Sequence, residues 1–283
     1  MEQATLTPAQ FEDFSSIISS RLGIKMPATK QVMLQSRLIR RLRELGLDSF
    51  TEYHERFFGD PEHQAEEMEH LLNLATTNKT DFFREPDHFE VLVREVLPAW
   101  LQAPTGSVFR IWCAGCSTGE EAYTLAMVLR EQQARAAFEY SILATDVSTR
   151  VLATAQQAIY AEEHVAPVPP PLRTKYLLRS RDRTSGQVRI TPEIRKKVRF
   201  AHLNFLAPDY GLRETVDVVF FRNVMIYFDR PTQKDVVSKI CRHLQPGGHL
   251  FIAHSESLQG LTLPVRLLGP AFFRHEPTPG RRP

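Results

Sequence analysis

Apolar residues spaced three and four positions apart run through the first 75 residues of the chain, where glycine is rare. Such spacing predicts amphipathic helices. We expect four helices, at about residues 8–22, 28–45, 49–58 and 61–75. Thr7 and Pro8 suit the start of the first helix, and Gly23 and Gly46 suit the ends of the first and the second. The pattern thus predicts a small all-α amino-terminal domain over residues 1–75.

After residue 100 the pattern changes to short apolar runs that alternate with helical stretches. Strands are expected at 108–112, 140–144, 197–205, 216–221, 249–256 and 271–276. Helices are expected over 86–100, from Glu120 onward, and over 147–158 and 231–244. This alternation predicts an α/β domain with a mostly parallel sheet over residues 76–283. The run 216–221, apolar apart from Asp217, is typical of a central parallel strand.

The alternation is interrupted between Ile159 and Lys197, a stretch that contains several prolines. A short helix near 172–178 and a β-hairpin that turns at Ser185–Gly186 are expected there. We interpret residues 160–197 as an inserted β-subdomain, and such insertions often recognise partners. The last residues, 277–283, are expected to form a disordered tail.

Composition narrows the class of protein. The chain has 283 residues, of which 42% are hydrophobic and 24% charged, which is ordinary for one or two globular domains. A formal net charge of +2 is too small to indicate bulk nucleic-acid binding. The sequence has three cysteines, no signal peptide and no long apolar run. We therefore expect a cytoplasmic protein without membrane insertion.

Cys113 and Cys116 form a C-x-x-C pair, which can be redox-active or half of a zinc site. No second pair completes a metal set, and Cys113 ends an apolar strand, so we prefer buried packing thiols. His202, His249 and His254 do not form a spaced set of ligands either. We therefore predict no metal site.

A glycine turn follows the first predicted strand. Gly115 and Gly119 bracket it, Thr118 is the expected N-cap, and Glu120 and Glu121 open the next helix. Glycines beside a helix start allow a ligand to approach closely, whereas two carboxylates there would repel a pyrophosphate. The turn therefore favours a cationic or hydroxyl-bearing ligand.

Chemically useful side chains follow three later strands. Asp146 ends the second strand, where an acid typically accepts hydrogen bonds from ribose hydroxyls; a helix N-cap is the alternative. Asn204 and Phe205 end another strand and could read the edge and the face of adenine. Asn223 lies at the carboxyl end of the 216–221 run, where ligands bind in open α/β sheets. Together these positions predict a nucleoside site.

Two further segments allow more than one interpretation. The second helix carries Arg37, Arg40 and Arg41 largely opposite its apolar face. A solvated arginine face and a docking surface for an acidic helical partner both fit this pattern. The polar loop before the first strand contains Phe82 and Phe83, an expected buried aromatic pair, and lies where a ligand lid would be found.

The motifs TNKTDFFRE, CAGCSTGEEAYTLAM and FFRNVMIYFD, in this order, resemble the chemotaxis receptor glutamate methyltransferases, the CheR family. The resemblance covers most of the chain. It implies a helical domain joined to a Rossmann-like S-adenosylmethionine-dependent methyltransferase domain with a small β-subdomain, which yields S-adenosylhomocysteine as product. It also implies cofactor contacts at Asn78, Thr80, Arg84, Glu121, Asp146, Asn204, Phe205, Asn223 and Val224.

The same resemblance implies that Arg84 and Tyr227 flank the reacting centre. It also implies that the basic face of the second helix, with the three arginines named above, meets the acidic methylation helices of a chemoreceptor. Three alternatives stay open. Arg84 could be an ion-pair partner of Glu85 or Glu121, Tyr227 could be a core residue, and Glu120 could replace Glu121 at the cofactor.

The predicted function is therefore methylation of glutamate side chains on chemoreceptor cytoplasmic helices, without a metal and without nucleic acid. A methyltransferase for another protein or a small molecule, and a docking module without catalysis, are the alternatives. Base-modifying enzymes usually have a D/N-P-P-aromatic motif where this chain has Arg222-Asn223-Val224. A receptor C-terminal peptide at the β-subdomain also stays open, because the hairpin turn SRDRTSG is charged and contains only Gly186.

Overall fold

The computed structural model describes residues 5–104 and 106–276, without the side chain of Arg183. The expected tail at 277–283 lies outside the described residues. By their internal contacts the residues divide into two compact units. A helical unit contains the residues up to Thr77 together with Tyr227–Thr232, and an α/β unit contains Asn78–Ile226 and the residues from Gln233 onward.

The helical unit follows the predicted pattern. Its elements are α1 Pro8–Leu22, the 3-10 turn η1 Ala28–Lys30, α2 Gln31–Leu45, α3 Phe50–Gly59 and α4 Pro61–Ala75. Thr7 caps α1, because its side chain accepts the Gln10 N–H at 3.3 Å while the Gln10 side chain accepts the Thr7 N–H at 3.0 Å. Gly23 and Gly46 end α1 and α2 with φ of 70° and 67°. The four predicted helices are confirmed, although the second begins as a 3-10 turn.

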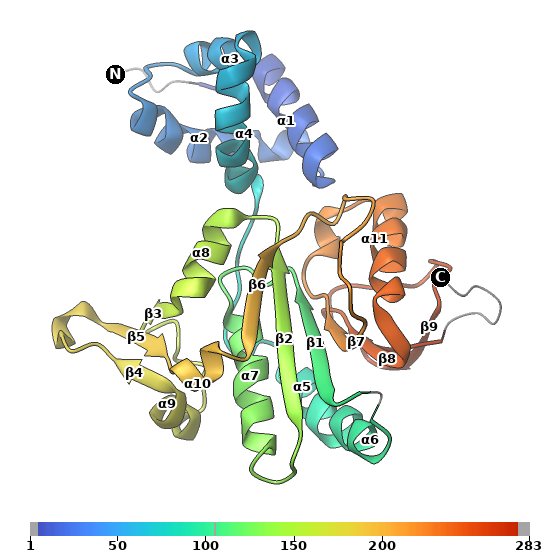
Figure 1. The fold of residues 1–283 in the computed structure, drawn as a ribbon. Coiled ribbons are helices and arrows are strands. Elements are labelled where there is room, and N and C mark those ends of the chain that lie inside the picture. The colour runs from blue at the N-terminus through green and yellow to red at the C-terminus, as the bar shows by residue number, and fades with distance from the viewer. Residues whose placement is uncertain (1–4, 105, 277–283) are drawn as a thin grey trace. The chain divides into compact units, whose positions relative to one another are not determined.

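A seven-stranded sheet forms the centre of the α/β unit (Figure 1). In spatial order its strands are β6 Val198–His202, β2 Glu139–Asp146, β1 Val108–Ala114, β7 Val216–Phe220, β8 Leu244–Phe251, β10 Phe272–His275 and β9 Val265–Gly269. The first five run parallel, whereas β10 and β9 are antiparallel additions at one edge. At the centre, Ile111 of β1 pairs with Ile142 of β2 and with Val218 of β7. The predicted α/β class is confirmed.

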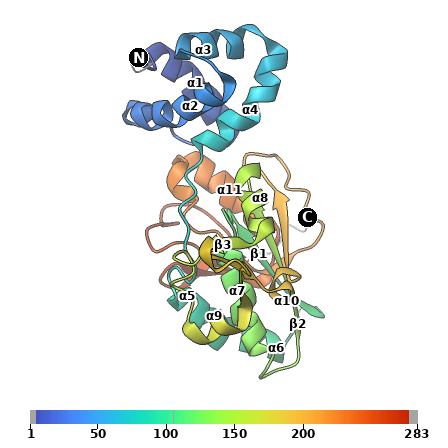
Figure 2. The same cartoon turned by 90° about the vertical axis from the view of Figure 1, so that its left-hand side faces the viewer.

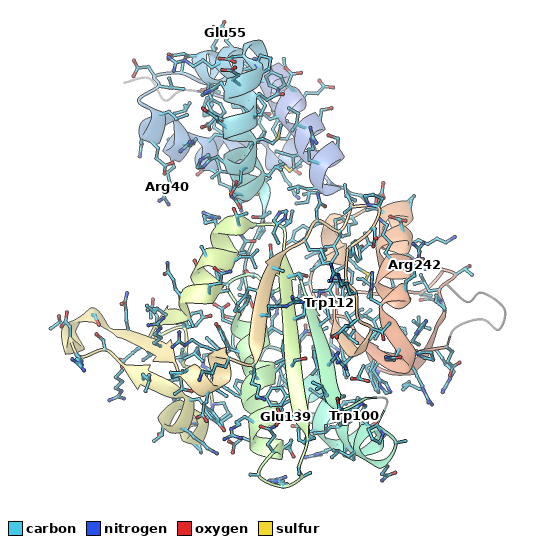
Figure 3. All side chains as sticks on the ribbon, viewed as in Figure 1. Arg40, Glu55, Trp100, Trp112, Glu139 and Arg242 are labelled. Atoms are coloured by element: carbon cyan, nitrogen blue, oxygen red, sulfur yellow. The ribbon has the colours of Figure 1, made fainter. Side chains whose placement is uncertain are left out.

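Both faces of this sheet are buried. The helices of the unit are α5 Asp87–Val91, the π-helical segment η2 Leu92–Val96, α6 Leu97–Gln102, α7 Glu120–Gln132, α8 Thr149–Gln157 and most of α11 Arg230–Arg242. The chain passes between the two units within the 3-10 turn η4 Met225–Tyr227 and again within α11. On β1, Ile111 and Cys113 belong to a core shared with α5, α6 and α7. Trp112, labelled in Figure 3, faces the other way and packs on Phe205 and Tyr210. Successive side chains of β1 therefore enter the cores on opposite faces of the sheet, as expected for a strand that is covered on both faces.

The helix predicted over 86–100 is not continuous. Between α5 and α6 the chain forms a π-helical segment, in which Leu97 donates its N–H to the carbonyl oxygen of Leu92. Pro98 follows directly and has no N–H with which to continue an α-helical ladder. We attribute the wider turn to this proline, whose effect the helical pattern did not predict.

A small antiparallel sheet forms the inserted subdomain. Its elements are β3 Ile159–Ala161, α9 Pro170–Tyr176, β4 Leu177–Arg179, η3 Arg183–Ser185, β5 Gln187–Ile190 and α10 Pro192–Arg195, with strand order β3-β5-β4. Gly186, with a φ of 56°, ends the turn between β4 and β5, so the predicted hairpin is confirmed. Figure 1 shows this sheet in yellow at the margin of the α/β unit, and Figure 2 turns that margin toward the viewer.

The last strands differ from the prediction in two ways. β8 begins before the turn-forming residues 246–248 instead of after them. Its register with β7 shifts between Val216 and Val218, which accommodates those residues as an irregularity within the strand. β9 was not predicted, because its residues Leu267 and Leu268 are exposed and do not alternate with polar ones. Among the described residues, no helix is long and apolar enough to cross a membrane.

Candidate functional site

Four neighbouring parallel strands end at one edge of the large sheet. In the order β6, β2, β1 and β7, their carboxyl ends lead to Asn204, Asp146, the turn 115–119 and Asn223. The sequence suggested these positions from four separate stretches of the chain. Ligands of open α/β sheets bind at this edge. The fold therefore brings the candidates together where a ligand is expected.

The turn after β1 has no room for larger side chains at its two glycines. A Cβ on Gly115, whose φ is 86°, would lie 2.4 Å from Cγ2 of Val224. A Cβ on Gly119, whose φ is 98°, would lie 3.0 Å from Cβ of Ala155. Both positions require glycine for space and for backbone conformation. The first contact also places Val224, a predicted cofactor residue, against the turn.

Thr118 is not the N-cap of α7, contrary to the prediction. Gly119 occupies that position directly before the helix begins at Glu120, and it has no side chain with which to cap the helix. The Thr118 hydroxyl donates instead to the carboxylate of Glu120, at 2.6 and 2.9 Å from its two oxygens. Burial raises the pKa of Glu120. This carboxylate is therefore already engaged within the turn.

Asp146 uses both carboxylate oxygens to hold backbone groups. Oδ2 accepts the N–H of Ser117 at 2.8 Å, and Oδ1 accepts the N–H of Ser148 at 2.9 Å. The N-cap of α8 is Ser148, so the alternative interpretation of Asp146 as that cap is wrong. Burial raises the pKa of Asp146, although the backbone hydrogen bonds act in the opposite direction. Val147 also donates a backbone hydrogen bond to this carboxylate. Of its roughly four acceptor positions, one is therefore left to accept a ligand hydroxyl.

The segment before α5 is attached to the glycine turn and to α7. The Ser117 hydroxyl donates to the carbonyl oxygen of Asn78 at 2.9 Å, and the N–H of Phe83 donates to Oγ1 of Thr124 at 3.1 Å. Phe83 and Glu85 have φ of 55° and 52°. Such left-handed residues are uncommon outside glycine and gather at functional sites. The predicted cofactor residues of this segment thus lie on a constrained loop beside the turn.

Arg222, which the sequence reasoning did not select, pairs with the acids of this region. Its Nε lies 3.1 Å from Oε2 of Glu121 and 3.6 Å from Oε2 of Glu85. Its Nη2 donates to the carbonyl oxygen of Arg84 at 2.6 Å. The Arg84 guanidinium instead donates to the carbonyl oxygen of Lys79 at 3.3 Å, so the ion-pair alternative for Arg84 is wrong. The sequence did contain a signal for this residue, because an arginine that directly follows a mostly apolar strand is expected to be buried and to pair with acids.

Glu121 also accepts a hydrogen bond from the thiol of Cys113, with 3.1 Å between sulfur and Oε1. Cys113 and Cys116 are free, buried thiols, and burial raises the pKa of both. The packing interpretation of this pair is therefore confirmed. Between the two glutamates at the start of α7, Glu121 is the one whose carboxylate contacts the ends of β1 and β7.

Glu256 is a second residue that the sequence reasoning missed. Its carboxylate accepts the N–H groups of Asn223, Met225 and Ala253 at 3.1, 2.9 and 2.9 Å. Burial raises the pKa of Glu256, while these hydrogen bonds favour its charged form. Asn223 has a φ of 60°. The carboxylate therefore fixes an unusual backbone conformation at the predicted cofactor residues Asn223 and Val224.

The ring of Phe205 is buried. It is 6% exposed and packs near Trp112 and Tyr210, with ring centroids 6.4 and 6.0 Å away. The structure contradicts the expectation that this ring reads the face of adenine, because it belongs to an aromatic core. Asn204 is half-buried, and its Oδ1 accepts the N–H of Leu206 at 2.9 Å.

The three arginines predicted for partner docking differ in their surroundings. The side chain of Arg40 is 80% exposed and pairs with Glu44 (Figure 3). Arg41 binds the buried carboxylate of Glu67 through hydrogen bonds of 2.6 and 3.0 Å. Arg37 donates to carbonyl oxygens at the end of α4, at 2.7 and 2.9 Å. The expectation of one basic face is corrected, since Arg37 and Arg41 hold the helical unit together.

Tyr227 belongs to the helical unit by its contacts. The N–H of Lys25 donates to its carbonyl oxygen at 3.0 Å, and its hydroxyl donates to the carbonyl oxygen of Thr77 at 3.3 Å. Nζ of Lys30 lies 5.8 Å from the centre of its ring. The residue is partly exposed, so the alternative interpretation as a core residue is wrong.

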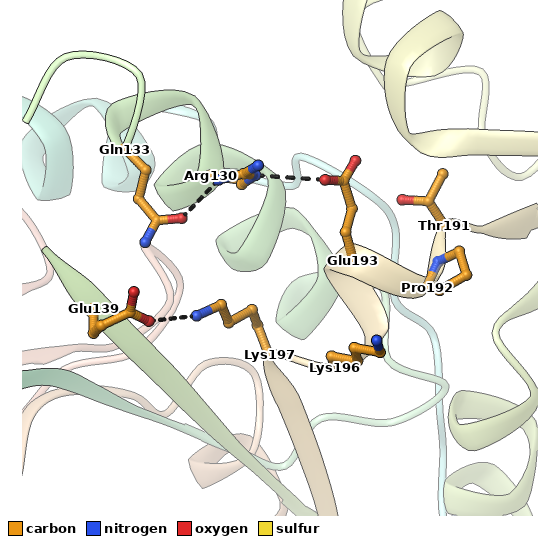
Figure 4. A pocket seen from close by; sticks show the side chains of 8 residues that line it. All are labelled: Arg130, Gln133, Glu139, Thr191, Pro192, Glu193, Lys196 and Lys197. Atoms are coloured by element: carbon orange, nitrogen blue, oxygen red, sulfur yellow. Dashed lines mark hydrogen bonds and ion pairs between the residues drawn. The ribbon is translucent and has the colours of Figure 1, made fainter. Parts of the chain in front are cut away.

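The α/β unit also contains a cavity that is not the candidate site. It is lined by Arg130, Gln133, Glu139, Thr191, Pro192, Glu193, Lys196 and Lys197 (Figure 4). Glu139 begins β2, whereas Asp146 ends it, so the cavity lies at the other end of that strand. Most of its charges are matched, with 2.7 Å between Lys197 and Glu139. The candidate functional residues lie at the carboxyl ends of the parallel strands, away from this cavity.

Comparison with known proteins gives a consistent result for both units. Residues 78–270 match the model of the CheR methyltransferase, SAM binding domain, and residues 9–76 match that of the CheR methyltransferase, all-alpha domain. The chain is 36% identical to the chemotaxis protein methyltransferase of Klebsiella aerogenes, over 96% of this chain and 91% of the relative. The corresponding Escherichia coli protein is 35% identical, over 96% and 92%. Chemotaxis protein methyltransferase 2 of Pseudomonas aeruginosa is 36% identical, over 93% and 92%. The chain therefore belongs to the CheR methyltransferase family.

Proposed function

We propose that this protein transfers a methyl group from S-adenosylmethionine to glutamate side chains on the cytoplasmic helices of chemotaxis receptors. The observation that carries the proposal is the sheet edge where the Asp146 carboxylate, the crowded glycine turn and the Asn223 loop meet. The substrate class is supported by the relatives, which are chemotaxis protein methyltransferases. Because the proposed substrate is the cytoplasmic part of a receptor, the proposal includes that the enzyme acts in the cytoplasm.

The residues at this edge fit a nucleoside that carries positive charge. Asp146 has an acceptor position left for a ribose hydroxyl. Glu121 brings negative charge beside the turn, although Arg222 partly balances it. Residues proposed to hold the cofactor are Asn78, Thr80, Arg84, Glu121, Asp146, Asn204, Asn223 and Val224, with the backbone of Phe205. When bound, S-adenosylmethionine supplies a methyl group activated by its positively charged sulfur.

The proposed acceptor needs little chemical activation. A glutamate side chain has an ordinary pKa of about 4.3, so it is already an anionic nucleophile at neutral pH. The protein therefore has to supply position and exclusion of water, and it needs no general base. The constrained loop of residues 78–85 and the loop held by Glu256 are suited to fixing a ligand rigidly.

Arg84 and Tyr227 are proposed to act on the substrate side. Arg84 would orient a carboxylate, and Tyr227 would hydrogen-bond the acceptor glutamate. We expect Arg84→Ala to lower turnover by about a hundredfold, because small losses of alignment have effects of this size. Arg94→Ala, an exposed arginine of the π-helical segment η2, is the matched control. Near-normal turnover in a folded Arg84→Ala protein would contradict the assignment.

The reaction itself is tested with methyl-labelled S-adenosylmethionine and purified receptor cytoplasmic domains. We expect label on receptor glutamates that mild alkali releases, since a carboxyl methyl ester hydrolyses in base whereas N-methyl groups do not. Alkali-stable label would indicate another acceptor group. Tight cofactor binding without labelled receptor would reject the proposed substrate and retain the methyltransferase fold.

A further inference from the structure

A cluster of side chains of metal-ligating types lies beside the segment that carries the proposed cofactor residue Arg84. Glu85 precedes α5, His88 lies in the first turn of α5, and His254 follows β8. One potential ligand atom from each lies within 4.8 Å of the others. Nδ1 of His88 is 3.5 Å from Oε2 of Glu85, and the rings of His88 and His254 are 4.6 Å apart. The sequence predicted no metal site, because His254 does not form a spaced set of metal ligands with the other histidines near it in the chain.

Several polar atoms of this cluster lack hydrogen-bond partners. His88 is 1% exposed, and within the described part of the chain neither of its ring nitrogens has a partner. Oε2 of Glu85 is buried without a hydrogen bond as well. Buried polar atoms are nearly always satisfied, since leaving one unpaired costs about 1–3 kcal/mol. The cluster therefore has unused coordinating capacity at atoms that lie close together.

The charges around the cluster favour a cation. Glu85, Asp87 and Glu121 contribute three carboxylates, and Arg222 contributes one guanidinium that pairs with two of them. The remaining excess is two negative charges, which one divalent ion would neutralise. Oδ2 of Asp87 lies 2.8 Å from Nε2 of His254. A carboxylate on one ring nitrogen is the usual means of orienting a metal-binding histidine.

We propose that Glu85, His88 and His254 bind one divalent transition-metal ion of the zinc class, with Asp87 positioning His254. Two imidazoles and one carboxylate form a common ligand set for such ions, which take a fourth ligand from water. His254 is 40% exposed at its side chain, so an ion can enter from solvent. The ion would join the start of α5 to the segment after β8. It takes no part in methyl transfer, and the proposal is independent of the substrate.

The site is tested by titrating the full, metal-free chain with zinc chloride in a calorimeter. We expect one bound ion per chain, and at least tenfold weaker binding in His254→Gln. His254 is partly exposed, so this variant should fold. His70→Gln, an exposed histidine on α4, is the control and should bind like the unaltered protein. Equal binding by His254→Gln and the unaltered chain, or no binding by either, would overturn the proposal.

A second measurement separates this site from the cysteines. Cobalt(II) gives visible bands of a tetrahedral ion, and a thiolate ligand adds intense charge-transfer absorption in the near ultraviolet. We expect the visible bands without the thiolate absorption, and their weakening in Asp87→Asn as well as in His254→Gln. Thiolate absorption in the unaltered chain would assign the metal to Cys113 or Cys116 and contradict the proposed ligands.

Discussion

Asp146 shows how one side chain can serve the fold and a ligand at the same time. Its two oxygens accept the N–H groups of Ser117 and Ser148, which ties the glycine turn of β1 to the loop after β2. A third backbone hydrogen bond, from Val147, also reaches this carboxylate. Of its roughly four acceptor positions, the one that is left is what the proposed ribose contact requires. The residue is therefore expected to matter for both stability and cofactor affinity.

We expect Asp146→Ala to weaken binding of S-adenosylmethionine by roughly ten- to a hundredfold. Losing a hydrogen bond to a charged group costs about 1.5–3 kcal/mol, which corresponds to that range of affinity. Isothermal titration calorimetry measures the affinity, with circular dichroism to show that the variant is folded. The exposed Asp48→Ala should bind normally. Unchanged affinity in folded Asp146→Ala would reject the ribose assignment.

At the scale of elements, the loop after β7 depends on a residue that comes after the next strand. Glu256 collects three backbone N–H groups, two of them from this loop. A carboxylate can accept hydrogen bonds from several such donors at once. The geometry of Asn223 is thus set by the end of β8 as much as by β7.

Glu256→Ala is expected to destabilise the protein by about 1–3 kcal/mol, because buried N–H groups lose their acceptor. It should also weaken cofactor binding. Glu256→Gln keeps one acceptor oxygen and should lose less of both. Urea unfolding and calorimetry measure the two effects, with the exposed Glu214→Ala as control. If Glu256→Ala lost stability but kept full cofactor affinity, the loop would not be part of the site.

β8 also carries a half-buried histidine, His249, that should make stability depend on pH. Burial, and then the nearby charge of Arg274, lower the pKa of His249 to about 4 from an ordinary value of 6.5. The unfolded chain therefore binds a proton between these values that the folded chain does not. Stability should fall as the pH drops from 6.5 toward 4, by up to about 1.4 kcal/mol per pH unit from this group.

The measurement is the free energy of unfolding in urea at several pH values in that window. His249→Gln should show a shallower decline than the unaltered protein, because it cannot take up the proton. The ring stacks on Phe272, so some stability is lost at every pH, and only the slope is informative. Parallel slopes for the two proteins would contradict the lowered pKa.

At the scale of the whole molecule, the basic helix α2 contributes to folding and to recognition through different arginines. Arg41 and Glu67 form a largely buried pair, with side chains 15% and 4% exposed. Removing one partner of such a pair leaves the other charge uncompensated. Arg40, in contrast, makes an exposed pair with Glu44, and exposed pairs contribute little to stability.

We expect Arg41→Ala to destabilise the helical unit by roughly 3 kcal/mol, measured by denaturant unfolding. Arg40→Glu should leave stability and cofactor affinity nearly unchanged and lower the rate of receptor methylation, with a smaller effect at high salt. If Arg40→Glu methylated receptors at the normal rate at low salt, α2 would not be the docking surface. If Arg41→Ala were as stable as the unaltered protein, its buried pair would be unimportant.

Local patterns were sufficient for much of this protein. Helix caps, glycine ends and apolar runs act over a few residues, so the four helices of the first unit and the parallel strands could be predicted from sequence. The positions of Asp146 and Asn223 followed from where each strand ends. The family resemblance added the residues around them, including Asn78 and Arg84, for which periodicity offered no argument.

Contacts between distant residues were decided only by the tertiary structure. Packing buries the ring of Phe205 and pairs Arg41 with Glu67. Both depend on neighbours in space that the local sequence pattern does not specify. Packing also brings Glu256 to Asn223 and His254 to His88, pairs that lie on different elements. The sequence by itself determined most of the elements and the ends of the strands where a ligand would bind. The fold decided which charges meet there, since electrostatic pairing depends on distance in space.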